Sequence, residues 1–115
     1  MTRRAIIDSE TERAASLFLE LVGSKFDVDH AVLFGSRARQ THKPDSDADL
    51  AVFLRGEHSR FLPVKLAMAD LAFDVLLETG ILIQPLPIWE DEWSAPAMYS
   101  NPQLLKNIAD EGVRL

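Results

Sequence analysis

Apolar and polar positions along the first part of the chain follow a helical period. Ser9 and Glu12 match a capping box, with Ser9 as the N-cap residue and Glu12 at the third helical position. Apolar residues then recur at helical spacing, and Gly23 stands where a left-handed C-terminal residue is favoured. The pattern predicts a helix from Ser9 to Val22.

Three short apolar runs indicate strands over residues 30–34, 47–54 and 81–88. The last run contains Pro85 and Pro87, which lack amide donors and lie two residues apart. Both missing donors therefore fall on the same side of the strand, which predicts an edge strand or an early end to pairing.

A longer helix is expected from Pro63 to about Thr79, ended by Gly80, because proline suits a first helical turn. It has two apolar stripes where a surface helix usually has one. The first stripe comprises Phe61, Val64, Met68, Leu71 and Val75. The second comprises Leu62, Leu66, Phe73 and Leu77. Such a helix either lies deep in its own core or also contacts a partner.

The remaining segments complete the order α-β-α-β-α-β-α. A short helix is expected over 36–40, and a loop over 89–98 whose Trp89 and Trp93 either anchor it to the core or contact a partner. Asn101-Pro102 caps a last helix that ends near Gly112. The first two strands can be parallel or antiparallel.

Composition narrows the class of protein. The 115 residues suit one compact domain, 1–115, and the absence of Cys excludes a disulfide framework and a thiolate-bound zinc. The N-terminus lacks the apolar run of a signal peptide and no segment is long enough to span a membrane, so we expect a soluble cytoplasmic protein. A net charge of −6 disfavours direct binding to duplex DNA but permits free nucleotides or a basic protein partner.

A Gly-Ser turn between the first strand and the short helix is a candidate phosphate site. Gly35 has no side chain, so its backbone can approach a phosphate closely, and Ser36 lies at a helix N-terminus that favours anions. Arg37 and Arg39 can add charge-assisted contacts, although Arg39, two residues further along the helix, points in another direction than Arg37. Taken alone, Gly-Ser is a weak signal, and a plain turn is the favoured explanation.

Asp47 and Asp49 are the second candidate. Residues i and i+2 of a strand share one face, and two carboxylates there repel each other unless a cation lies between them. Mg²⁺ prefers one or two carboxylates together with phosphates and water. A solvated strand face is the alternative for an isolated Asp-x-Asp, but the combination with the turn ten residues earlier favours a nucleotide site.

The combined pattern resembles the minimal nucleotidyltransferase (MNT) group of the DNA polymerase beta-like nucleotidyltransferase superfamily. The matching residues are Gly35-Ser36-Arg37-Ala38-Arg39 and Ser46-Asp47-Ala48-Asp49-Leu50. In element order the resemblance covers about residues 26–93.

The resemblance implies an α/β fold with a small mixed β-sheet and flanking helices. It also implies binding of ATP or another nucleotide with Mg²⁺, and transfer of a nucleotidyl group to a hydroxyl. In these roles Asp47 and Asp49 are catalytic and hold the metal, while Gly35, Ser36, Arg37 and Arg39 bind the nucleotide. Many stand-alone members of this size resemble antitoxins that neutralise a helical HEPN-domain toxin by binding it and adding AMP to a tyrosine.

Two departures from the family pattern bear on activity. Gln40 stands where a Gly usually follows the second Arg. More seriously, the third carboxylate that active members carry on the third strand falls, by spacing from Gly80, on Leu82. Gln84 shares that strand face but is neutral, and Glu78 is a conceivable substitute. Losing a general base commonly lowers a rate by about 10²–10⁴.

Three hypotheses follow. The first is an adenylyltransferase antitoxin acting on a HEPN toxin, and the second is a catalytically degenerate antitoxin that acts by binding only. The third, a subunit that modifies small molecules, is disfavoured because no second domain is present to form an acceptor pocket. The three histidines, His30, His42 and His58, show no metal-ligand spacing. Oligomerisation with itself or a partner stays open.

Overall fold

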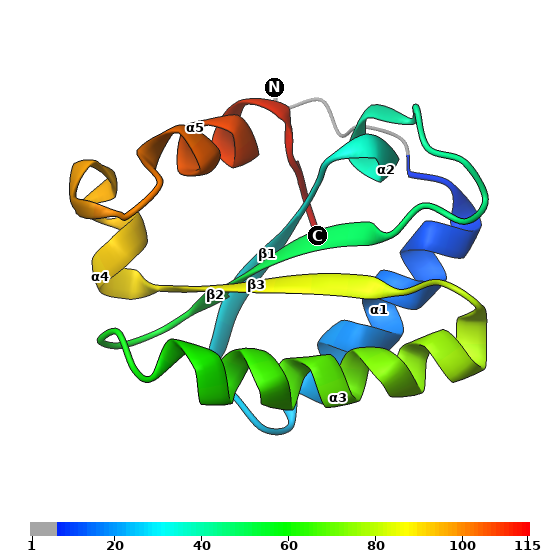
Figure 1. The fold of residues 1–115 in the computed structure, drawn as a ribbon, viewed down its shortest axis with the longest axis horizontal. Coiled ribbons are helices and arrows are strands. Elements are labelled where there is room, and N and C mark those ends of the chain that lie inside the picture. The colour runs from blue at the N-terminus through cyan, green and yellow to red at the C-terminus, as the bar shows by residue number, and fades with distance from the viewer. Residues whose placement is uncertain (1–6) are drawn as a thin grey trace.

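The protein is an α/β structure with one four-stranded mixed sheet, as the computed structural model of residues 7–115 shows (Figure 1). The order of strands is β3-β2-β1-β4. The elements are α1 (Ser9–Gly23), β1 (Val28–Phe34), α2 (Ser36–Arg39), β2 (Ala48–Leu54), α3 (Phe61–Thr79), β3 (Ile83–Trp89), α4 (Glu90–Trp93), a 3₁₀ turn (Pro96–Met98), α5 (Pro102–Glu111) and β4 (Val113–Arg114). The predicted fold class is therefore confirmed.

The pairing of strands in the sheet shows whether the first two strands are parallel or antiparallel, which the sequence left open. β1 runs antiparallel to β2, with Phe34 opposite Asp49, and antiparallel to β4. β2 and β3 are parallel, with Asp49 opposite Gln84. The carboxyl end of β1 therefore lies beside the amino ends of β2 and β3, and this meeting point creates one corner of the molecule.

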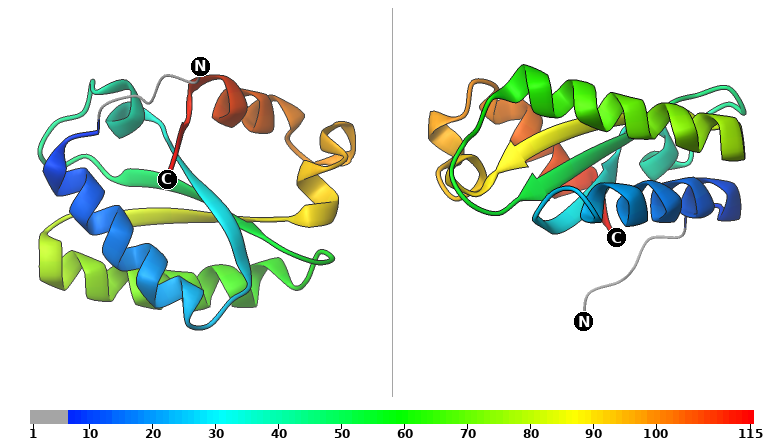
Figure 2. Two further views of the ribbon diagram at one scale, coloured as in Figure 1. Left: turned by 180° about the vertical axis from the view of Figure 1, so that it is seen from behind. Right: turned by 90° about the horizontal axis from the view of Figure 1, so that it is seen from below.

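Two apolar clusters cover the two faces of the sheet. α1 and α3 pack on one face, where Phe18, Leu50 and Val75 are fully buried. α5 packs on the other face against Ala51 and Phe53. Figure 2 shows α1 lying across the strands when the molecule is seen from behind. Side chains of β2 alternate between these clusters, so Asp49 lies on the same face as Ala51 and Phe53.

β3 is an edge strand, as its two prolines predict. Because Pro85 and Pro87 have no amide hydrogen, they turn their nitrogens to the outer edge of the sheet. The Pro85 carbonyl on that edge accepts a hydrogen bond from the Lys65 ammonium of α3. The edge therefore has few free backbone groups.

The start of α1 differs from the prediction. Asp8, not Ser9, is the N-cap residue, and its carboxylate accepts hydrogen bonds from the Thr11 amide at 3.0 Å and the Thr11 hydroxyl at 2.7 Å. The predicted capping box on Ser9 and Glu12 is wrong because the carboxylate one residue earlier makes both contacts. The helix ends at Gly23.

Acid sensitivity of α1 follows from this cap. Burial alone would raise the pKa of Asp8, but the two Thr11 hydrogen bonds, with His42 and Arg37 nearby, bring it below its ordinary value. The ionised cap thus stabilises the fold above the unfolded pKa, and this contribution is lost as pH falls through the lowered pKa. We expect Asp8→Ala to lower the free energy of unfolding by about 1 kcal/mol at pH 7 and by less at pH 3, measured by urea unfolding. An unchanged difference at the two pH values would contradict this assignment.

Several other segments depart from the predicted boundaries. The segment 89–98, expected to be a loop, contains α4 and the 3₁₀ turn, and Trp89 is buried in the core. β1 begins at Val28, two residues early, β2 begins at Ala48, so that Asp47 lies just outside it, and β3 begins at Ile83, two residues late. α3 begins at Phe61, which places Pro63 in its first turn as expected. β4 was not predicted.

No helix within residues 7–115 combines the length and the apolar character needed to cross a bilayer. The N-terminal residues 1–6, on which part of the expectation of no signal peptide rests, lie outside the described residues.

Candidate functional site

The Gly-Ser turn and the aspartate strand meet at one corner of the sheet. Gly35 links β1 to α2 with φ +75° and ψ −157°, a conformation that residues with a side chain rarely adopt. A Cβ atom on Gly35 would lie 2.3 Å from the Asp49 Oδ2 atom. The carboxylate of Asp49 therefore packs directly against the backbone of the turn, and only glycine fits there.

Asp49 is partly buried, and its side-chain carboxylate has no hydrogen-bond or ion-pair partner among residues 7–115. Burial, and then the negative charge of Asp47, raise its pKa above the ordinary value, while the charges of Arg39 and Lys65 act in the opposite direction. A carboxylate without a donor, next to a second carboxylate, is unfavourable in the absence of a cation. The sequence prediction that both aspartates share one face is consistent with this arrangement.

Gln84 lies beside the two aspartates on the neighbouring strand. Its side-chain amide donates to Asp47 Oδ2 at 3.1 Å, and it stands opposite Asp49 in the parallel register. Sequence spacing placed Leu82 at the third carboxylate's position, and the structure corrects this. Leu82 is half-buried against the core and its carbonyl accepts from the Ala48 amide. The β3 residue in contact with the aspartates is thus a neutral glutamine.

Glu78 does not replace the missing acid. It lies near the end of α3 in a groove beside Leu17 and Leu21 of α1. That groove belongs to the helix pair on one face of the sheet, whereas Asp49 is on the opposite face. The suggestion that Glu78 completes the site is therefore wrong.

Arg37 was predicted to contact phosphate, but in the structure it stabilises the fold. The guanidinium is 2% exposed and donates to the Thr11 hydroxyl at 2.8 Å, the Ser46 carbonyl at 2.9 Å and the Pro44 carbonyl at 3.2 Å. These three hydrogen bonds join α1, α2 and the loop before β2. Because its donors point into the protein, Arg37 is not placed to bind a nucleotide.

Arg39 and Lys65 supply the positive charge near the corner. Arg39 is exposed at the end of α2, and its charge favours the ionised form of Asp49. Lys65 reaches from α3 to the edge of β3, where burial lowers its pKa and the charge of Asp49 opposes that shift. Sequence reasoning ranked Arg39 below Arg37 and missed Lys65, whose only sequence signal was a lone cation in an apolar helix.

The corner has the groups to bind a phosphate ester and a divalent cation. The first amides of a helix lack intrahelical acceptors, and those of α2 follow Gly35 directly. Asp47, directly before β2, and Asp49, within it, both offer carboxylate oxygens beside Gln84 of β3. Residues 7–115 contain no group of three or more acidic, His or Cys side chains placed to hold a metal. Two carboxylates beside a phosphate site suit an ion such as Mg²⁺, which takes few protein carboxylates and completes its shell with phosphate and water.

Comparison with known proteins agrees with this geometry. The family model described as a nucleotidyltransferase domain matches residues 15–113. The chain belongs to the nucleotidyltransferase domain family. No curated protein matches the chain.

A solved structure supports the nucleotidyltransferase fold. It is the crystal structure of a protein from Sulfolobus solfataricus that carries the provisional name nucleotidyltransferase. The two chains are 20% identical, the match covers 99% of this chain and 87% of the other, and the TM-score is 0.57. At this identity the likeness establishes the fold alone.

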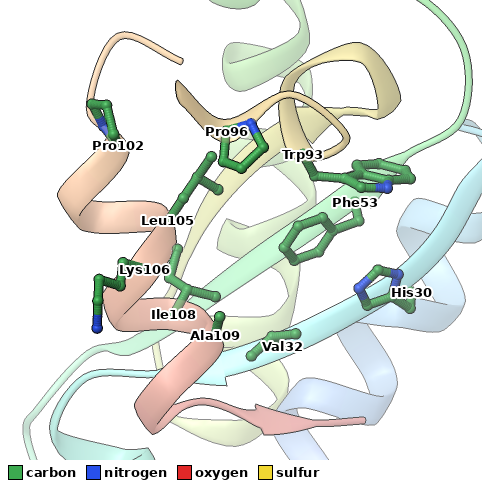
Figure 3. Close-up of a pocket in the computed structure, with 10 residues that line it drawn as sticks. All are labelled: His30, Val32, Phe53, Trp93, Pro96, Pro102, Leu105, Lys106, Ile108 and Ala109. Atoms are coloured by element: carbon green, nitrogen blue, oxygen red, sulfur yellow. The ribbon is translucent and has the colours of Figure 1, made fainter. Parts of the chain in front are cut away.

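A second concavity in this nucleotidyltransferase domain lies between α5 and the sheet (Figure 3). It measures about 450 Å³ and is walled by aromatic rings: His30 stacks on Phe53 with centroids 4.3 Å apart, and Trp93 meets both edge-on. Its polar groups already have partners, since His30 pairs with Asp29 and Lys106 with Asp110. The pocket therefore adds no free charge to the corner.

Proposed function

We propose that this nucleotidyltransferase-fold chain binds ATP with Mg²⁺ at the corner formed by Gly35 and Asp49, and transfers the AMP group to a partner protein. The partner is a helical HEPN-domain toxin for which the chain is the MNT antitoxin. The observation that carries the nucleotide part is the packing of the Asp49 carboxylate against the bare backbone of Gly35. The partner rests on the family resemblance.

Each group at the corner has a role in this proposal. The turn at Gly35 and Ser36 holds the triphosphate, and Arg39 and Lys65 offset its negative charge. Asp47 and Asp49 would hold Mg²⁺, whose charge would neutralise the phosphates. The AMP transfer forms a bond between the acceptor hydroxyl oxygen and the α-phosphorus and breaks the bond to pyrophosphate, and the hydroxyl proton leaves to a base.

A transfer assay tests the enzymatic proposal. The chain, a candidate HEPN-domain partner protein and ATP labelled on the α-phosphate are incubated with Mg²⁺. We expect label on the HEPN protein, and its loss with Asp47→Asn but not with the exposed control Asp45→Asn. Unlabelled HEPN protein with either Mg²⁺ or Mn²⁺ would contradict the enzymatic proposal.

A second function, antitoxin action by binding alone, is favoured by the neutral Gln84 beside Asp47. No carboxylate on β3 is then available to take the proton of the acceptor. This alternative predicts that Asp49→Asn still neutralises the co-expressed HEPN toxin in a growth assay. Toxicity in the presence of the folded variant would contradict it.

The substitution Gln84→Glu tests how strongly the missing third carboxylate affects metal binding and transfer. A glutamate of the same size at this position adds a third carboxylate next to Asp47 and Asp49. We expect Mg²⁺ to bind about tenfold more tightly with ATP present, because the charge of the ligand set increases, and any transfer rate to rise. Isothermal titration measures the affinity, and Gln103→Glu on exposed α5 is the matched control. Equal affinities for the two variants would show that Gln84 is not part of the site.

A further inference from the structure

The outward side of α3 carries large apolar side chains that no described part of the chain covers. Leu62, Leu66, Phe73 and Leu77 are 62%, 56%, 55% and 72% exposed, and we call them the outer stripe. The opposite side of the same helix is buried in the core, whereas the outer stripe lies outside that core cluster. Exposed apolar patches of this kind usually mark interaction sites.

A groove between α1 and α3 extends this surface. It has a volume of about 350 Å³ and is lined by Leu17 and Leu21 of α1 together with Leu77 of the outer stripe. Asp74 and Glu78 stand at the same groove. The apolar surface is therefore hollowed on one side, and its wall there is acidic.

Three acidic residues form a row along α3, beside the outer stripe. Asp70, Asp74 and Glu78 are spaced four residues apart, which places them in one row along a flank of α3. None of the three side-chain carboxylates has a hydrogen bond or an ion pair within residues 7–115. A row of uncompensated carboxylates beside an apolar stripe calls for a basic partner.

We propose that the outer stripe and the adjoining groove bind an amphipathic α-helix of a partner protein, with Lys or Arg residues along one side of its apolar stripe. The outer stripe runs from Leu62 to Leu77, a helical length of about 22 Å. A partner helix of about four turns matches it, with apolar residues on the stripe and cations against Asp74 and Glu78.

A second copy of the chain fits this surface less well. In a two-fold pair with antiparallel α3 helices, the flank that carries Asp70, Asp74 and Glu78 faces the same flank of the other copy. Like charges would then meet along the contact, which is unfavourable. The charge pattern therefore selects a basic partner.

This inference is independent of the nucleotide corner. Asp49 lies on the face of the sheet that α5 covers, whereas α1 and α3 cover the other face. Helix binding can thus be measured without ATP or metal, and its failure leaves the proposed transfer reaction untouched.

Two helix-stabilised synthetic peptides of fifteen residues test the proposal. Both carry the same leucine stripe, flanked by Lys in one peptide and by Glu in the other, and both are labelled for fluorescence anisotropy with the full chain. We expect the Lys peptide to bind at least tenfold more tightly than the Glu peptide. Equal binding of the two peptides, or no binding of either, would overturn the proposal.

Variants of exposed residues then locate the contact without disturbing the core. Phe73→Ser should weaken the Lys peptide at least tenfold, whereas Met98→Ser, an 85% exposed control away from α3, should not. Asp74→Lys with Glu78→Lys should reverse the peptide preference, and Glu57→Lys should leave it unchanged. Sedimentation of the chain alone is the last measurement: a dimer that Phe73→Ser dissociates would show that a second copy occupies the surface and would refute the proposal.

Discussion

Asp49→Asn is expected to weaken the binding of ATP with Mg²⁺ by at least about 100-fold and, at the same time, to raise the melting temperature of the protein. The loss of affinity follows from removing one of the two carboxylates proposed to hold the ion. The gain in stability follows from the raised pKa of Asp49, which shows that its ionised form is unfavourable in the fold because of burial and the charge of Asp47.

The pH dependence of this effect has a definite sign. The folded protein holds the Asp49 proton more tightly than the unfolded chain does, so ionisation costs stability above the folded pKa. As pH falls through that raised pKa, the wild-type chain regains this stability and the advantage of the amide shrinks. Differential scanning calorimetry of the two proteins from pH 7 to pH 4 measures it, with Asp45→Asn as the exposed control.

The expected loss of ATP affinity and the expected gain in melting temperature can be contradicted separately. Unchanged ATP affinity in Asp49→Asn would refute the nucleotide corner. A lower melting temperature for the variant at pH 7 would show instead that the carboxylate stabilises the apo protein.

Arg37→Met is expected to lower the free energy of unfolding by about 3–5 kcal/mol, a large part of the stability of a domain of this size. The substitution leaves the Thr11 hydroxyl and the carbonyls of Pro44 and Ser46 without their donors. Urea unfolding followed by circular dichroism measures the loss, and the exposed Arg39→Met should stay within about 0.5 kcal/mol of the wild type.

Thr11→Val provides a milder test of the same network, because it removes one partner of Arg37 and should still fold. We expect a loss of about 1–3 kcal/mol. If both Arg37→Met and Thr11→Val unfold as the wild type does, the buried guanidinium does not join α1 to the loop before β2.

Local periodicity was sufficient to predict most of the fold. The two prolines of β3 indicated its place at the sheet edge. The two stripes of α3 left open whether the second lies in the core or faces a partner, and the structure exposes it. The meeting of Gly35 with Asp49 was expected only from the combined motif, because the sequence left open whether the first two strands are parallel or antiparallel. The antiparallel pairing of β1 with β2 is what brings the turn and the carboxylate to the same end.

Features that depend on distant contacts were not predictable. Arg37 finds Thr11 26 residues earlier in the chain, and its charge alone gave no sign that it would be buried. The register that pairs Asp49 with Gln84 is set between strands, and a slip of two residues keeps the same face, so spacing from Gly80 alone assigned the position to Leu82. β4 has only two residues, too few for a period, and forms because α5 delivers them to β1.

The arrangement of β3 also bears on how the chain behaves at high concentration. An unprotected sheet margin can recruit strands from other molecules and seed insoluble aggregates. Here Pro85 and Pro87 remove two amides from that margin, and Lys65 occupies the Pro85 carbonyl. The protein thus has a built-in barrier to fibril growth along this side of its sheet, one that does not rely on any other molecule being present.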